Sequence, residues 1–144
     1  RKFKKENFKK FHPGGMLGKS LLLVKDIMHT KDKLPLINNN NTMREALLKM
    51  TSYGFGCVGI TNSKKNLIGI ITDGDLRRNI SKKFLDLPIE KIMTKNPITV
   101  ASKMNIKDTL DIMNNNKITA IFVIKNSSKI PEGIIHIHDC LKIG

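Results

Sequence analysis

Two short polar strings stand where chemistry could occur, because each directly follows an apolar run. The first string carries Thr72 and Asp75, and the second carries His136 and Asp139. Where a strand ends and a helix starts, the Thr72 hydroxyl and the Asp75 carboxylate could hold the hydroxyls of a ribose, while helix-start amides face a phosphate. The alternative is that Asp75 only caps a helix, and both interpretations stay open for the first string. His136 and Asp139 are the corresponding ligand candidates, but a helix cap is favoured there because histidine replaces the threonine.

The second string also contains residue types that bind metals. His136 and His138 are two residues apart, and on a strand they would face the same side. With Asp139 or Cys140 they could hold a metal ion, but no second group of ligands has a supporting spacing. The acidic residues of 73–75 lack the downstream acids of a calcium loop. We therefore expect no metal and no other cofactor.

The chain repeats itself. Four segments recur in the same order, at offsets of 65, 63, 63 and 64 residues: 24–28 as 89–93, 45–50 as 108–113, 57–61 as 120–124, and 69–75 as 133–139. Ordered matches with nearly constant spacing predict a tandem of two units of about 60 residues each. We assign the first unit to residues 23–80 and the second to residues 81–144.

Each unit is predicted to run strand, helix, strand, strand, helix. In the first unit, Thr42 and Glu45 have the spacing of a capping box, and apolar residues then follow at helical spacing. Gly54 suits the left-handed residue that ends such a helix. Apolar, β-rich runs joined by polar turns predict a hairpin in each unit. The expected strands are 34–37, 57–61 and 67–72 in the first unit, and 98–100, 120–124 and 133–137 in the second.

The net charge of +14 raises the question of a nucleic-acid partner, because lysine-rich surfaces attract phosphate backbones. Only four of the 26 basic residues are arginine, the residue that favours bidentate contacts with bases and phosphates. Aromatic residues make up 5% of the chain, too few for a platform on which single-stranded bases stack. We therefore interpret the charge as spread over the surface and expect no nucleic-acid partner.

Apolar segments and cysteines indicate the compartment. The purely apolar runs, such as Leu21–Val24 and Ala120–Ile124, are far shorter than the roughly 20 residues of a membrane span. No secretory signal pattern follows the basic start. Cys57 and Cys140 lie in or beside apolar runs without C-x-x-C spacing, which is typical of buried, reduced cysteines. These patterns predict no membrane partner and a cytoplasmic location.

The repeated string at the end of the third strand resembles the signature of CBS domains, which are named after cystathionine beta-synthase. Residues 69–75 fit that G-h-h-[ST]-x-x-D signature, whereas the second copy departs from it at His136 but keeps Asp139. The resemblance spans about residues 24 to 142. It implies an α/β tandem CBS-domain pair, with two β-α-β-β-α repeats in pseudo-twofold symmetry that pack through their sheets and leave clefts between them. By the same analogy, Thr99 becomes a third ligand contact.

Residues 1–22 resemble the end of a sugar isomerase (SIS) domain, through the H-P-G-G-M-L-G string that begins at His12. Together with the T-D-G-D-L-R-R string at Thr72, this is similar to the SIS-to-CBS junction of bacterial arabinose-5-phosphate isomerases. These enzymes interconvert ribulose 5-phosphate and arabinose 5-phosphate, the entry step to the octulosonate sugar of lipopolysaccharide. His12 would correspond to a histidine of the isomerase site, where an imidazole suits proton transfer through an enediol. The other catalytic groups would lie upstream, so the chain alone is expected to be inactive.

The resemblance therefore implies a regulatory module rather than a complete enzyme. The expected partners are a nucleotide or nucleotide-sugar effector, the upstream SIS domain, and further copies of the chain in a homo-oligomer. The alternative is a purely structural module that assembles the enzyme and binds no ligand.

Overall fold

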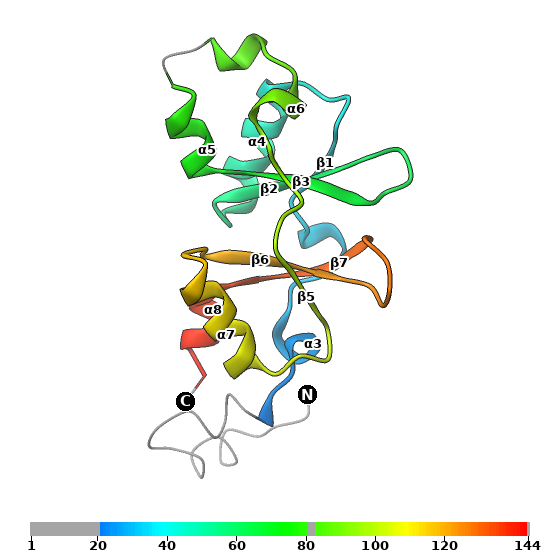
Figure 1. The fold of residues 1–144 in the computed structure, drawn as a ribbon, viewed down its shortest axis with the longest axis vertical. Helices are drawn as coiled ribbons and strands as arrows, with labels where there is room; N and C mark the ends of the chain where they lie inside the picture. The colour runs from blue at the N-terminus through cyan, green and yellow to red at the C-terminus, as the bar shows by residue number, and fades with distance from the viewer. Residues whose placement is uncertain (1–20, 81–82, 144) are drawn as a thin grey trace.

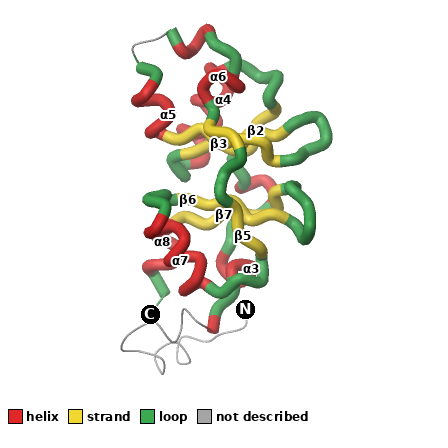
Figure 2. The backbone as a smooth tube through the Cα atoms, in the orientation of Figure 1, coloured by secondary structure: helices red, strands yellow, loops and turns green. Residues whose placement is uncertain are grey.

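A computed structural model of the chain describes residues 21–80 and 83–143. Two β-sheets lie face to face, and helices cover their outer faces (Figure 1, Figure 2). The first sheet has the order β1 (Leu36–Asn38), β2 (Cys57–Thr61), β3 (Leu67–Thr72) and β4 (Thr94–Lys95). The second has the order β5 (Thr99–Ala101), β6 (Ala120–Ile124) and β7 (Pro131–His136). The predicted α/β pair of repeats that pack through their sheets is confirmed.

The second sheet repeats the topology of the first three strands of the first sheet, as a tandem repeat requires, and β4 is added to the first sheet beside β3. β1 runs parallel to β2, which forms an antiparallel hairpin with β3. In the second sheet β5 is parallel to β6, and β6 is antiparallel to β7. The helices are α3 (Val24–Ile27), α4 (Met43–Tyr53), α5 (Asp73–Arg78), α6 (Ile89–Ile92), α7 (Ile106–Asn115) and α8 (Ile137–Leu141), with short 3-10 turns η1 (Lys31–Lys33) and η2 (Phe84–Asp86).

The local signals of the sequence act as predicted in α4. The Thr42 hydroxyl accepts the backbone N–H of Glu45, and the Glu45 carboxylate accepts the backbone N–H of Thr42. Gly54 ends the helix with φ of 75°, a left-handed conformation that glycine adopts without a steric penalty. The short first strands begin one or two residues later than predicted, at Leu36 and Thr99, because pairing with β2 and β6 sets their register.

The short helix that leads each repeat packs against the sheet of the other repeat. Figure 1 shows α3 beside β5 and β7, and α6 beside α4 and the first sheet. Backbone hydrogen bonds join Val24 to Met104 and Ile106 to Leu22. Leu22 and Val24 consequently belong to the core of the second repeat. This exchange ties the two repeats together through the chain segments as well as through the sheets.

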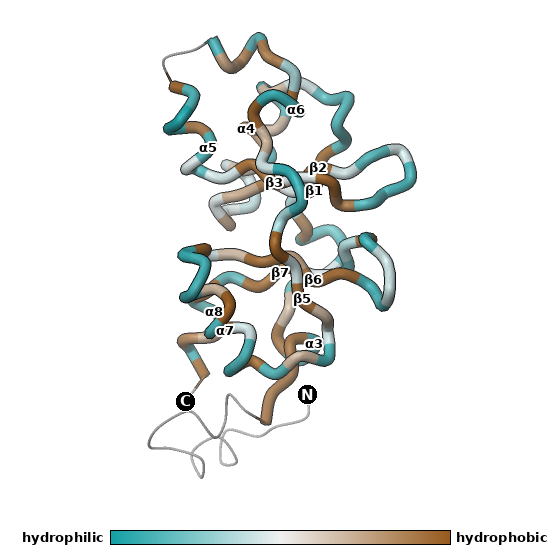
Figure 3. The backbone as a smooth tube through the Cα atoms, in the orientation of Figure 1, coloured by the Kyte–Doolittle hydropathy of each residue, from teal (hydrophilic) through white to brown (hydrophobic). Residues whose placement is uncertain are grey.

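A separate apolar layer lies between the two sheets. Its buried residues are Cys57, Leu67, Ala120, Phe122 and Ile134. Figure 3 shows the hydrophobic colouring along β6 and β7 and the hydrophilic colouring of the turn between β2 and β3. This layer holds the repeats in a fixed relation, so residues from both repeats can form one site at its edge.

Candidate functional site

A cavity of about 620 Å³ opens where the two repeats meet. One wall of the cavity is formed by the segment around Thr72. The other walls come from the segment that leads into β5 and from the segment that precedes β6. Its lining residues are Gly56, Cys57, Ile70, Thr72, Asp73, Gly74, Arg77, Arg78, Thr94, Asn96, Pro97, Ile98, Lys117, Ile118, Thr119 and Ala120. The cavity is within the size range of small-molecule sites and needs both repeats to exist.

The lining combines three kinds of surface. Among the described lining residues, the cationic side chains are those of Arg77, Arg78 and Lys117, and the one carboxylate is that of Asp73. Hydroxyl groups come from threonines of both repeats, and isoleucines supply an apolar wall. An apolar wall with a few polar groups and excess positive charge suits an organic anion that carries hydroxyl groups.

Asp75 lies directly beneath this lining and is not the helix cap. Of the two interpretations left open, the one in which Asp75 itself is the N-cap is wrong: α5 begins at Asp73, and Thr72 is the N-cap. The Thr72 hydroxyl accepts the Asp75 N–H at 3.3 Å, and the Asp75 carboxylate accepts the Thr72 N–H at 2.9 Å. Thr72 and Asp75 therefore form the same reciprocal capping box as Thr42 and Glu45.

Asp75 is 3% exposed and has two further partners. The Thr94 hydroxyl donates to Asp75 Oδ1 at 2.7 Å, and the Arg78 guanidinium pairs with the same oxygen. Of the predicted ligand residues, the structure thus brings Thr72 and Asp75 together. Thr94 and the cationic residues of the cavity were not predicted from the sequence.

The second repeat reproduces this arrangement with imidazoles in place of hydroxyls. His136 is the N-cap of α8, and its Nδ1 accepts the backbone N–H of His138 at 3.1 Å. The Asp139 carboxylate accepts the His136 N–H and lies 3.0 Å from His29 Nε2. His29 also lies edge-on to the ring of Phe55, with centroids 5.2 Å apart.

One expectation for this string is wrong, because His138 does not lie on the strand. β7 ends at His136, and α8 begins at Ile137 because Nδ1 of His136 and the carboxylate of Asp139 satisfy the first amides of a helix. The imidazoles of His136 and His138 stack with centroids 4.8 Å apart. Within residues 21–80 and 83–143, no three His, Cys, Asp or Glu side chains are grouped to hold a metal ion.

The cap formed by His136 should make the stability of the fold depend on pH. Burial, and then the neighbouring His138, lower the pKa of His136, an effect that Asp139 opposes and His29 adds to. A lowered folded-state pKa means that the unfolded chain binds more protons just below the ordinary value of 6.5. The stabilising contribution of His136 to the free energy of unfolding is therefore complete above pH 6.5, and it is lost as the pH falls below that value.

We expect His136→Thr, which restores the residue type of the first repeat, to flatten this dependence. Free energies of unfolding, measured by urea denaturation from pH 8 to pH 5, should fall less steeply in the variant than in the wild type. The remaining histidines are common to both chains, so the difference reports His136 together with its electrostatic coupling to His138 and His29. Identical slopes would show that this cap does not titrate with folding.

Cys57 lies in the wall of the cavity but is not a nucleophile at neutral pH. Burial, assisted by the nearby carboxylate of Asp73, raises the pKa of its thiol to about 12. The thiol is therefore protonated under ordinary conditions, and Cys57 acts as a small apolar group, as does the buried Cys140.

Thr99, predicted as a third ligand contact, is not among the residues that line the cavity. Thr99 begins β5 opposite Phe122, one residue after the lining segment that ends at Ile98. His12 lies outside the described residues. No helix in the part of the chain that the structure describes is long and apolar enough to span a bilayer.

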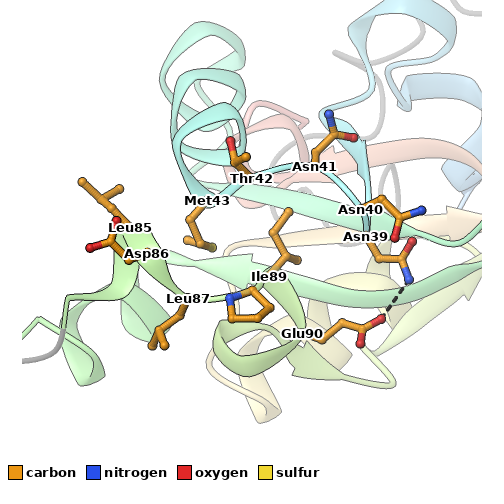
Figure 4. Close-up of a pocket in the computed structure, with 11 residues that line it drawn as sticks. Asn39, Asn40, Asn41, Thr42, Met43, Leu85, Asp86, Leu87, Ile89 and Glu90 are labelled. Atoms are coloured by element: carbon orange, nitrogen blue, oxygen red, sulfur yellow. Dashed lines mark hydrogen bonds between the residues drawn. The ribbon is translucent and has the colours of Figure 1, made fainter.

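A second cavity, of about 470 Å³, lies on the first repeat between the loop before α4 and the segment around η2. Figure 4 shows Asn39 joined to Glu90 at one end of this cavity, with a 2.8 Å hydrogen bond from Nδ2 to Oε2. Among the described residues, its lining includes the carboxylates of Asp86 and Glu90 and no lysine or arginine. It therefore disfavours anions, in contrast to the cavity between the repeats.

Comparison with known proteins agrees with this architecture. The CBS domain profile matches residues 24–82 and 89–144, and the chain belongs to the CBS domain family. It is 40% identical over 144 residues to uncharacterized protein RP505 of Rickettsia prowazekii (strain Madrid E). It is 39% identical over 147 residues to arabinose 5-phosphate isomerase KdsD of Salmonella typhi. The whole chain is matched in both cases, but it spans only 44% of the length of each of these curated relatives.

A solved structure shares the fold. The CBS domain pair of protein MJ0100, in complex with 5'-methylthioadenosine and S-adenosyl-L-methionine, is 26% identical and superposes with a TM-score of 0.71. The match covers 83% of this chain and 97% of that one.

Proposed function

We propose that this chain is the ligand-sensing module of an arabinose-5-phosphate isomerase and binds a nucleotide or nucleotide-sugar between its two repeats. The observation that carries the proposal is the inter-repeat cavity, which combines cationic groups, threonine hydroxyls and an apolar wall. A nucleotide needs these three features, for its phosphate, its ribose and its base. The described residues that line the acidic second cavity supply no cationic group.

Each part of the cavity has a proposed role. Ile70, Ile98 and Ile118 form a wall against which a planar base can pack. Thr72 and the underlying Asp75 provide acceptors for the ribose hydroxyls, and the cationic residues hold the phosphate. The MJ0100 pair is crystallised with two adenosine derivatives, which supports a nucleoside-type ligand for this fold.

The parent protein is inferred from the relatives. Because KdsD of Salmonella typhi is about twice as long as this chain, we propose that an upstream SIS domain carries the isomerase site and that His12 belongs to its border. Ligand binding between the repeats would bias that domain, and substrate binding there would change effector affinity by the same factor. A CMP-linked sugar of the octulosonate pathway would suit such feedback.

Self-association is proposed as the second role of the module. Leu48 on α4 is 68% exposed and Leu141 on α8 is 56% exposed, so both offer apolar contacts to another copy or to the upstream domain. A purely structural module would use these surfaces and leave the cavity empty. Sedimentation velocity distinguishes a monomer from an oligomer, and ligand titration decides whether the cavity is used.

Calorimetric titration with AMP, CMP and a CMP-linked sugar tests the proposed function. We expect saturable binding of at least one of them to the wild-type chain. Lys117→Glu, which reverses a charge in the cavity, should weaken binding about tenfold or more, the effect of losing one charge-assisted contact. Lys129→Glu makes the same change of charge on an exposed turn outside the lining and should leave affinity unchanged. No binding to the wild type would favour the purely structural module.

A further inference from the structure

We infer that Arg78 is a latch that covers Asp75 and thereby selects phosphorylated ligands over neutral nucleosides. This inference rests on the proposed function, because it concerns how a nucleotide reaches the first-repeat carboxylate. It assigns to Arg78 a role in specificity that is separate from general attraction of anions.

The Asp75 carboxylate has no free face in this structure. Its Oδ2 accepts from the Thr72 N–H at 2.9 Å and from the Thr72 hydroxyl at 3.2 Å. Its Oδ1 accepts from the Thr94 hydroxyl at 2.7 Å and from the Arg78 guanidinium. With a side chain only 4% exposed, Asp75 can accept a ribose hydroxyl only if one of these donors leaves.

Arg78 is the donor that can leave. The Thr72 N–H is fixed by the backbone, and the hydroxyls of Thr72 and Thr94 sit on short side chains. The Arg78 side chain is 67% exposed, so its guanidinium can move into solvent or along the cavity wall without losing packing. When the contact breaks, water solvates the exposed guanidinium, but the buried Asp75 carboxylate then needs a replacement donor, which a ribose hydroxyl can supply.

The released guanidinium would still lie in the cavity. Its Nη1 is the atom nearest to a Cβ placed on Gly74, at 3.3 Å, and Thr72 Oγ1 and Nη2 of Arg77 lie 3.5 Å and 3.9 Å from the same point. Two guanidiniums thus converge beside Gly74 at the mouth of the site. A phosphate bound beside Gly74 gives Arg78 a new anionic partner when a ribose hydroxyl replaces Arg78 as a donor to Asp75. A nucleoside without a phosphate must break the ion pair without this compensation.

The second repeat lacks the latch. Lys142 occupies the position that corresponds to Arg78, three residues after Asp139. Among the described residues, Lys142 has no ion pair with Asp139, which instead contacts His29 and is 19% exposed. The latch is therefore a property of the first repeat and not of the repeated fold.

Titration of adenosine and AMP against wild type, Arg78→Ala and Arg77→Ala tests this inference. In Arg78→Ala, adenosine should bind about two- to fivefold more tightly, because a half-exposed ion pair no longer competes. AMP should bind about tenfold or more weakly, because a charge-assisted hydrogen bond is lost. In Arg77→Ala, which removes a neighbouring cation that does not touch Asp75, AMP should weaken while adenosine is unchanged. Arg78→Lys should keep most of the AMP affinity, and thermal melts establish that each variant is folded.

The outcomes separate the latch from the proposed function. Tighter adenosine binding in Arg78→Ala alone supports the latch, even if the wild type binds adenosine too weakly to detect. Adenosine binding that is unchanged or weakened in Arg78→Ala, with AMP still bound by the wild type, overturns the latch and leaves the proposed function standing. Absence of binding of both ligands to all the chains overturns both.

Discussion

Replacing Phe122 by alanine is expected to lower the free energy of unfolding by about 3–5 kcal/mol, the range for truncating a fully buried aromatic side chain. Phe122 is 1% exposed on β6 and lies in the apolar layer between the two sheets. Its Cζ lies 2.7 Å from a Cβ placed on Gly59 of β2, so the ring rests directly on the backbone of the other repeat. The truncation would leave a void at the contact that fixes one repeat against the other.

Urea denaturation followed by circular dichroism measures this loss. Phe122→Leu, which refills much of the void, should lose well under half as much stability as the alanine variant. Ile130→Ala removes an apolar side chain that is 39% exposed and serves as a surface control, with an expected change within about 0.5 kcal/mol. A loss below about 1 kcal/mol for Phe122→Ala would contradict the packing of the sheets described above.

Replacing Asp75 by asparagine is expected to weaken nucleotide binding by about 10- to 100-fold, which corresponds to losing a charge-assisted hydrogen bond of about 1.5–3 kcal/mol. The cavity lies on the Asp75 side of the repeat interface, next to Thr72 and Thr94. Asp139→Asn changes the equivalent carboxylate of the second repeat, where His29 and Phe55 lie in contact. We expect it to change affinity less than threefold or so, within the effect of a remote substitution.

The comparison is matched because both carboxylates are the third residue of a short helix and accept the N–H of its cap. Asparagine keeps one acceptor oxygen but places an amide among the donors around Asp75, so Asp75→Asn should also lower the melting temperature. Affinities must therefore be measured where both variants are folded. Equal losses of affinity in the two variants would refute the predicted asymmetry between the repeats.

The repeated fold could be predicted from the sequence because each unit carries strong local signals. Capping residues, helical spacing and hairpin turns each depend on neighbours in the chain, and they recur at a constant offset. The spacing of Thr72 and Asp75 also matches the capping box at Thr42 and Glu45, so Thr72 was identifiable as the cap. The alternative in which Asp75 itself is the N-cap does not take this parallel into account.

Other features depend on contacts that no local pattern records. α3 is only four residues long, and nothing in its sequence indicates that Val24 enters the core of the second repeat. The cavity joins Thr72 to segments that follow α6 and precede β6, which come together only when the sheets pack. The repeat offset does place Thr94 at the position that corresponds to His29. In the structure each of these residues contacts the carboxylate of one repeat, Thr94 that of Asp75 and His29 that of Asp139.

The most direct test of the central claim is an NMR titration of the isotopically labelled chain with AMP and with CMP. If a nucleotide binds between the repeats, backbone amide shifts will change together in the two segments 94–98 and 117–120, and also at Thr72–Gly74. The signals around Asn39–Met43, at the acidic cavity, will stay in place. The account would be contradicted by shift changes that are confined to one repeat or centred on the acidic cavity. It would also be contradicted if no shift changed at millimolar nucleotide, roughly the weakest affinity worth assigning to a specific site.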